Sequence, residues 1–338
     1  MNAFAPLATV RVSERGDRVA IRAFVEAHAD ATPFHLPEWS EAVEKGTGQK
    51  SLTLLAERGG RLVGMLPLTE VRSLLFGSAL VSTGFGVDGG VLGEGVDDLV
   101  EAAWVLAQSR GCACVELRGG PVPAGWTTKQ GLYHGFTRDL PQGEEAILKA
   151  IPRKQRAEVR RALGSDLEVG IGRDLDTHYR VYAESVRNLG TPVFPRALFE
   201  AVLDGLDADI VTVRREGRAL ASVLSLYFRG TVYPYWGGGT REARSARANE
   251  LLYFALMRHA AGRGCTRFDF GRSKAGTGAF AYKKNWGFEP RPLIYAAKGE
   301  ARETNPLSPR YRLQVALWKK LPLWAANRLG PPIARGLG

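Results

Sequence analysis

Alternating and periodic apolar positions predict a set of strands and helices that occurs twice along the chain. Two alternating apolar runs joined by a charged Gly-Arg turn lie at residues 56–68 (AERGGRLVGMLPL) and 213–226 (VRREGRALASVLSL). This pattern is typical of a β-hairpin. Each hairpin precedes a strand that ends in glycines and then a helix of period 3.6, over about 96–109 and 249–262.

A strand that follows Arg-Gly-Cys closes both copies. Residues 107–120 (AQSRGCACVELRGG) resemble residues 260–273 (AAGRGCTRFDFGRS), at an offset of 153 positions. Internal similarity of this kind, with four elements in one order, indicates gene duplication. The sequence therefore predicts an α/β (α+β) fold of two tandem units, each a mixed sheet flanked by helices.

A basic helix connects the two copies. The stretch AIPRKQRAEVRRALGSD places Pro152 in a first turn and Gly164 at a helix end. We expect a first unit at residues 1–150, a second unit with this connector at 151–298, and a C-terminal tail at 299–338.

Composition excludes several protein classes. The chain has 338 residues, 45% of them apolar and 24% charged, which is ordinary for a folded protein and unlike a disordered one. Three cysteines and five scattered histidines give neither a disulfide framework nor metal-ligand spacing, so we expect no metal. The chain shows no signal peptide pattern and no run of about 18 apolar residues. A cytoplasmic location is expected.

Charge is distributed unevenly. Residues 1–150 carry 14 Lys and Arg against 18 Asp and Glu, whereas residues 151–338 carry 32 against 17. This asymmetry predicts an anionic partner for the second half, a phosphate-bearing substrate, RNA or an acidic membrane surface; scattered solvated arginines are the alternative.

The stretch FDFGRSKAGTGAFAYKKNWGF, residues 268–288, gathers the candidate chemistry. Its strand carries Asp269, Arg272 and Lys274, and the short helix that follows carries Lys283 and Lys284 among aromatic residues. Glycines in the intervening loop let the backbone approach an anionic ligand. The alternative is a core helix whose lysines extend past the aromatic rings to solvent.

Several segments together carry a family resemblance. FHLPEW near the start, RKQRAEVRRAL after the first copy, ESVRNLGTP, RGCTRFDFG and YKKNWGF resemble the FemAB family of peptidyltransferases, whose members have two successive units of the GNAT acyltransferase fold. The run DFGRSK...TG...KKNWGFEP is similar to FemAB-like proteins associated with PEP-CTERM and exosortase exopolysaccharide systems. The resemblance covers about residues 30–298.

The resemblance implies transfer of an acyl or aminoacyl group to a nucleotide- or lipid-linked cell-envelope or exopolysaccharide precursor. Lys283 matches the family's motif lysine and would stabilise charge at the transferred carbonyl, and Arg187 matches an arginine that binds acceptor phosphate. Asp269 is the candidate base or lysine partner. Further candidates for substrate binding are Trp39, Tyr235, Arg272, Lys274 and Lys284.

The donor stays open between aminoacyl-tRNA and acyl-CoA. Tyr282 and Asn285 stand where the family has Phe and Gly, which weakens the expectation of aminoacyl-tRNA. Acetyl-CoA-dependent N-acetyl transfer would require a backbone amide cradle beside Gly237–Gly239. The alternative outside catalysis is a binding module for an anionic glycan precursor or RNA.

The tail mixes large apolar residues with arginine and lysine over residues 309–337 and contains no acid there. This composition predicts an interfacial helix, broken at Pro322, that binds the inner-membrane surface. The alternative is a tail packed on the protein body with its apolar face inward.

Overall fold

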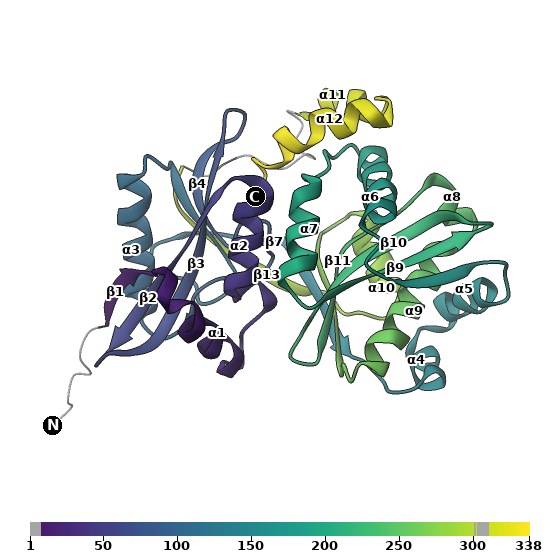
Figure 1. The fold of residues 1–338 in the computed structure, drawn as a ribbon, viewed down its shortest axis with the longest axis horizontal. Coiled ribbons are helices and arrows are strands. Elements are labelled where there is room, and N and C mark those ends of the chain that lie inside the picture. The colour runs from purple at the N-terminus through teal and green to yellow at the C-terminus, as the bar shows by residue number, and fades with distance from the viewer. Residues whose placement is uncertain (1–7, 301, 303–310) are drawn as a thin grey trace. The chain divides into compact units, whose positions relative to one another are not determined.

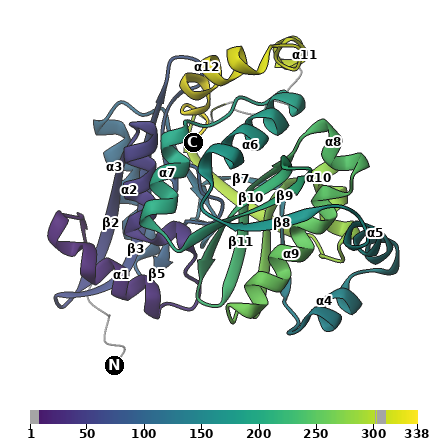
Figure 2. The same ribbon diagram turned by 45° about the vertical axis from the view of Figure 1, so that its right-hand side comes forward.

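The computed structural model describes residues 8–300, 302 and 311–338 (Figures 1 and 2). The chain forms two compact units, each assembled from separate stretches of sequence. Unit 1 comprises the described residues of 1–130, 294–304 and 332–338, and unit 2 those of 131–293 and 305–331. The boundaries expected after residues 150 and 298 differ from these edges. The strand at residues 127–139 pairs with a strand of the second copy, and the strand at residues 291–299 pairs with a strand of the first.

Unit 1 contains a mixed sheet of order β1-β2-β3-β4-β6-β13, with the short β5 paired to β3. The neighbours β4 and β6 are parallel, and the other recorded pairs are antiparallel. Apolar residues of α3 pack on these strands and form the core of the unit. Its elements are β1 (Thr9–Val12), η1 (Arg15–Asp17), α1 (Arg18–Ala27), η2 (Pro33–His35), α2 (Pro37–Thr47), β2 (Lys50–Arg58), β3 (Arg61–Ser73), β4 (Gly77–Ser82), β5 (Leu92–Gly93), α3 (Val96–Ser109), β6 (Cys114–Arg118) and β13 (Arg291–Gly299).

Unit 2 contains a mixed sheet of order β8-β9-β10-β11-β12-β7, in which β11 and β12 are parallel. The tail helices α11 and α12 are the last two elements along the chain. Its elements are β7 (Thr127–Asp139), α4 (Glu144–Ala150), α5 (Arg153–Leu163), β8 (Glu168–Gly172), α6 (Leu175–Leu189), α7 (Arg196–Gly205), β9 (Ala208–Arg215), β10 (Arg218–Phe228), β11 (Thr231–Gly239), α8 (Arg241–Ser245), α9 (Ala248–Gly262), β12 (Arg267–Lys274), α10 (Gly278–Asn285), α11 (Arg312–Trp318) and α12 (Leu323–Ala334).

The predicted duplication is confirmed. The series β2-β3-β4-α3-β6 in unit 1 and β9-β10-β11-α9-β12 in unit 2 have the same order, and the same pair of strands is parallel in each. Both hairpins turn through two residues with positive φ, Gly59 and Gly60 in one and Glu216 and Gly217 in the other. Such turns match the twist of the strands that they join.

Helices cover both faces of the sheet in unit 2. Successive strand residues point to opposite faces. Val223 of β10 lies in the core formed with α9, whereas the hydroxyl of the adjacent Ser222 contacts His178 of α6 at 3.0 Å. Helices α9 and α6 therefore cover opposite faces. The predicted connector helix is α5, which packs against α9.

Among the helices of the described residues, none has the length and apolar character that spanning a bilayer requires.

Candidate functional site

Lys283 lies in the interior of unit 2, on α10 opposite the irregular part of β12. Thr277 caps this helix, its hydroxyl accepting a hydrogen bond from the Phe280 amide. The Lys283 ammonium donates to the carbonyl oxygens of Gly271 and Arg272, at 3.2 and 2.9 Å. Only 9% of the residue is exposed. Two of the three ammonium protons are thus held by strand carbonyls, and one remains for a further acceptor.

A bulge in β12 creates these acceptors. The register between β12 and β7 shifts between Asp269 and Arg272, and Gly271 at the shift has φ +66°. Bulges leave carbonyl groups outside the regular ladder and redirect side chains. A positive φ is readily adopted by glycine, so Gly271 allows the turn that aims the carbonyls at Lys283.

Burial controls the charge of Lys283. Loss of water contact lowers the pKa of Lys283 from 10.5 to about 7; the Asp269 carboxylate acts in the opposite direction and the Arg272 cation adds to the lowering. The ammonium also lies 5.3 and 5.5 Å from the ring centroids of Phe136 and Phe270. These rings favour the charged form. Lys283 therefore exchanges its proton near neutral pH.

Asp269 is half-buried beside this lysine, and its pKa is shifted in the complementary direction. Burial raises the pKa of the Asp269 carboxyl, against hydrogen bonds from Gly271 and Thr137 and the charge of Lys283. Its Oδ1 accepts the Gly271 amide at 2.7 Å. A carboxyl and an amine whose pKa values both move toward neutrality can hold or pass a proton during acid–base chemistry.

Acidic and phenolic groups of α9 and α10, none of which was predicted as a site residue, surround the same part of the core. Burial raises the pKa of Glu250 and raises that of Tyr253 to about 12, and the Glu250 carboxyl interacts with Gln155 of α5. Tyr282, directly before Lys283, also has its pKa raised by burial. The only sequence signal was an acid in the first turn of a helix, which equally suits the helix dipole.

The other predicted residues of this stretch lie on the same two elements. The Arg272 guanidinium lies 4.7 Å from the centroid of the Tyr133 ring of β7, and Lys274 is half-buried at the end of β12. Lys284 is exposed on α10. Tyr235 of β11 packs edge-on against Trp236, with centroids 4.9 Å apart. Strand β12 and helix α10 thus carry five of the eight predicted residues.

Arg187 and Trp39 have other surroundings. Arg187 of α6 donates from Nη1 to the Leu321 carbonyl in the tail, at 3.3 Å. Trp39 of α2 is fully buried in unit 1, where its indole N–H donates to the Gly84 carbonyl at 3.2 Å and its ring meets Phe34 edge-on. In these positions Arg187 contacts the tail and Trp39 is part of the core of unit 1.

The glycine run Gly237–Gly239 serves close packing of helices on β11. A Cβ at Gly237 would lie 2.8 Å from the Tyr253 hydroxyl, one at Gly238 2.6 Å from Ser185 Cβ, and one at Gly239 2.7 Å from Ala243 Cβ. Side chains of α9, α6 and α8 therefore lie directly against these three glycines, α9 and α6 on opposite faces of the sheet. These contacts concern added side-chain atoms, and the backbone amide cradle that the acetyl-CoA alternative would require beside Gly237–Gly239 stays a prediction.

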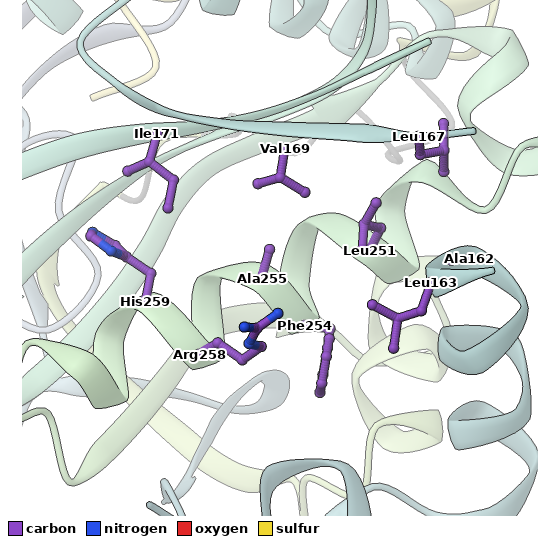
Figure 3. Close-up of a pocket in the computed structure, with 10 residues that line it drawn as sticks. All are labelled: Ala162, Leu163, Leu167, Val169, Ile171, Leu251, Phe254, Ala255, Arg258 and His259. Atoms are coloured by element: carbon purple, nitrogen blue, oxygen red, sulfur yellow. The ribbon is translucent and has the colours of Figure 1, made fainter. Parts of the chain in front are cut away.

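An apolar groove of about 510 Å³ lies along β8 in unit 2. Figure 3 shows Val169 and Ile171 pointing from the strand toward α9, which contributes Ala255. The two basic groups in its wall have acidic partners: Arg258 pairs with Glu144 at 2.9 Å, and His259 with Asp209 at 2.6 Å. This groove contains none of the residues that the sequence predicted for the site.

Comparison with known proteins identifies the fold. Residues 153–284 match the family described as "Acetyltransferase (GNAT) domain". The structure of FemX is similar at a TM-score of 0.65 and 15% identity, over 84% of this chain and 96% of FemX. A tandem GNAT protein from the clavulanic acid biosynthesis pathway has a TM-score of 0.54 and 13% identity, over 86% of this chain and 98% of its own.

A third similar structure is the C-terminal domain of a putative lysylphosphatidylglycerol synthetase from Agrobacterium fabrum, with a TM-score of 0.56 and 13% identity over 85% of this chain and 93% of that domain. Comparison with curated proteins gives no match. Residues 153–284 therefore match a GNAT-type acetyltransferase domain, and the chain has the tandem GNAT-like fold that the sequence predicted.

Proposed function

We propose that the protein is an acyl or aminoacyl transferase that forms an amide or ester on a nucleotide- or lipid-linked cell-envelope or exopolysaccharide precursor. The observation that carries the proposal is the neighbouring pair of buried Lys283 and half-buried Asp269 within the segment that matches a GNAT acetyltransferase domain, the pKa of each displaced toward neutrality. Displaced pKa values in buried polar pairs are typical of catalytic sites.

The proposed reaction uses few protein groups. The acceptor nitrogen or oxygen attacks the carbonyl carbon of an ester or thioester donor, and the bond from that carbon to the donor oxygen or sulfur then breaks. The acceptor proton passes to Asp269, and the remaining N–H of Lys283 stabilises the oxyanion of the tetrahedral intermediate. The donor is already activated, so positioning and oxyanion stabilisation supply most of the acceleration.

Two donor classes remain in the proposal. The likeness in fold to FemX supports an aminoacyl donor, and the match of residues 153–284 to an acetyltransferase domain supports acyl-CoA.

The test supplies the purified chain with radiolabelled aminoacyl-tRNA or acyl-CoA and with nucleotide-linked or lipid-linked precursors, and measures label and mass gained by the acceptor. Removing one oxyanion donor typically slows a reaction about 10²- to 10³-fold. We expect a loss of this size in Lys283→Ala with folding retained. Lys149→Ala, an exposed lysine of α4 that has no part in the candidate site, is the control and should keep the wild-type rate.

Two results would contradict the proposal. Unchanged turnover in Lys283→Ala would exclude this lysine from the mechanism. Tight precursor binding without transfer from either donor would instead indicate the binding module for an anionic glycan precursor or RNA.

A further inference from the structure

The tail helices α11 and α12 each have an inner side that packs on unit 2. A Cβ at Gly190, just after α6, would lie 2.5 Å from Val315 Cγ1, and one at Gly330 would lie 3.0 Å from the Val193 amide nitrogen. Glycine at these two positions therefore allows close packing of the tail. The figures show the yellow tail helices beside α6 (Figures 1 and 2). The tail is held on the protein body by its inner side.

The outer side of these helices exposes large apolar residues. Leu313 and Leu317, one turn apart on α11, are 70% and 58% exposed, and Trp324 and Leu329 of α12 are 74% and 51% exposed. Residues at i and i+4 share one helix face, so the two leucines form a stripe. Single exposed apolar residues are ordinary, but four of them within 17 residues indicate a contact surface.

Cations accompany this apolar surface without any acid. Exposed basic residues of the two helices and their connection are Arg312, Lys319, Lys320 and Arg328. The sequence from residue 304 to 338 contains no Asp or Glu. Arg328 follows Trp324 by one turn and lies on its face of α12. The surface therefore combines leucine and tryptophan side chains with uncompensated positive charge.

We infer that the outer side of α11 and α12 docks on an anionic lipid bilayer surface. Tryptophan and leucine enter the boundary between headgroups and acyl chains, and lysine and arginine attract acidic lipid headgroups. An RNA ligand would use the cations but leave the leucines in water. The inference is independent of the proposed function and requires only the exposed face of the folded tail.

Vesicle binding tests the inference. The full chain is sedimented with vesicles of phosphatidylcholine alone or with one third phosphatidylglycerol. We expect binding to the anionic vesicles that weakens as salt rises, because salt screens charges at the membrane surface. Each basic residue near an anionic bilayer contributes about 1 kcal/mol, which is about fivefold in partitioning, so Lys320→Gln with Arg328→Gln should weaken binding about 25-fold.

The apolar part of the surface is tested by Leu317→Ser with Trp324→Ser, which should abolish detectable sedimentation. Leu74→Ser with Val19→Ser is the matched control, since both residues are exposed apolar residues of unit 1, and it should bind as wild type. Circular dichroism and unfolding temperature check that each variant folds. Brominated lipids should quench tryptophan fluorescence in the wild type and much less in Trp324→Phe.

Three outcomes would overturn the inference. Equal binding to neutral and anionic vesicles would exclude recognition of anionic lipid. Vesicle binding that survives both tail variants would assign it to another surface. A concentration-dependent dimer that Trp324→Ser abolishes, without vesicle binding by the wild type, would show that a second copy of the chain covers this face.

Discussion

The two units have the same strand order but differ in the partners of one buried charged residue in each, Glu70 in unit 1 and Lys283 in unit 2. In unit 1, Glu70 of β3 is only 6% exposed and accepts from Arg72 at 2.6 Å and from Arg110 at 2.7 Å. Burial tends to raise the pKa of Glu70, but hydrogen bonds and the charges of these two arginines outweigh it and lower the pKa. Such a carboxylate stays ionised and has no proton to exchange at neutral pH.

In unit 2 the buried cation has carbonyl dipoles as its hydrogen-bond partners. Lys283 contacts Gly271 and Arg272 through their main-chain oxygens, and burial dominates its pKa. The nearby Asp269 carboxylate only partly offsets burial, so the charged and uncharged forms of Lys283 are closer in free energy than those of Glu70, which is hydrogen-bonded to two arginines. The comparison teaches that two units with the same strand order can hold one buried charge fixed, as at Glu70, and leave another free to change near neutral pH, as at Lys283.

The largest expected effect is on unit 1 and concerns Trp39. Because Trp39 is fully buried, Trp39→Ala should lower the free energy of unfolding by about 3–5 kcal/mol, measured by urea denaturation. Trp39→Phe keeps an apolar ring and should leave the Michaelis constant for the acceptor unchanged. A raised Michaelis constant in a stably folded Trp39→Phe protein would return Trp39 to the substrate site and give unit 1 a chemical role.

A smaller effect is expected for Glu70→Gln. Hydrogen bonds to charged groups contribute about 1.5–3 kcal/mol each, and the arginine partners are partly solvated, so we expect a loss of about 2 kcal/mol in unfolding free energy. Transfer activity should stay at the wild-type level at a temperature where the variant is folded. A fall in rate without loss of stability would break the contrast between the units.

Within a single pH unit, the smallest expected effect is a pH dependence of stability due to Lys283. The unfolded chain holds the lysine proton up to about pH 10.5, and the folded chain releases it near pH 7. Between these values the unfolded state binds more protons, so stability rises with pH, at most by about 1.4 kcal/mol per pH unit. Urea denaturation between pH 7 and 9.5 should show this slope in the wild type and a flatter one in Lys283→Met; equal slopes would mean that the folded lysine keeps its ordinary pKa.

Local patterns in the sequence were sufficient to predict the repeated elements of the fold. Alternation of apolar residues and the Gly-Arg turns gave both hairpins, and the Arg-Gly-Cys segments gave the equivalent strands β6 and β12. The pairing of β7 with β12 and of β13 with β6 was not predictable, because pairing partners depend on contacts distant in sequence. A period-2 pattern fixes which side of a strand is apolar, not which strand lies beside it.

The candidate site was predictable only in part. Clustering of charge and glycine in residues 268–288 indicated Asp269 and Lys283, which do lie together in unit 2. Glu250 was missed because its loss of water contact depends on α5 packing against α9, and a single helix pattern does not reveal this. The contact of Arg187 with Leu321 was not predicted. It depends on how the tail packs on α6, which the local sequence does not specify.

The crossing of the chain between units has a consequence for biosynthesis. Strand β13, residues 291–299, completes the sheet of unit 1 by pairing with β6, yet it leaves the ribosome only after nearly all of unit 2. Until then β6 presents unpaired backbone groups, the kind of edge that promotes association between nascent chains. Truncation after residue 150 would make this state permanent, so the first 150 residues expressed alone should aggregate, whereas supplying residues 288–302 as a separate peptide should improve their recovery.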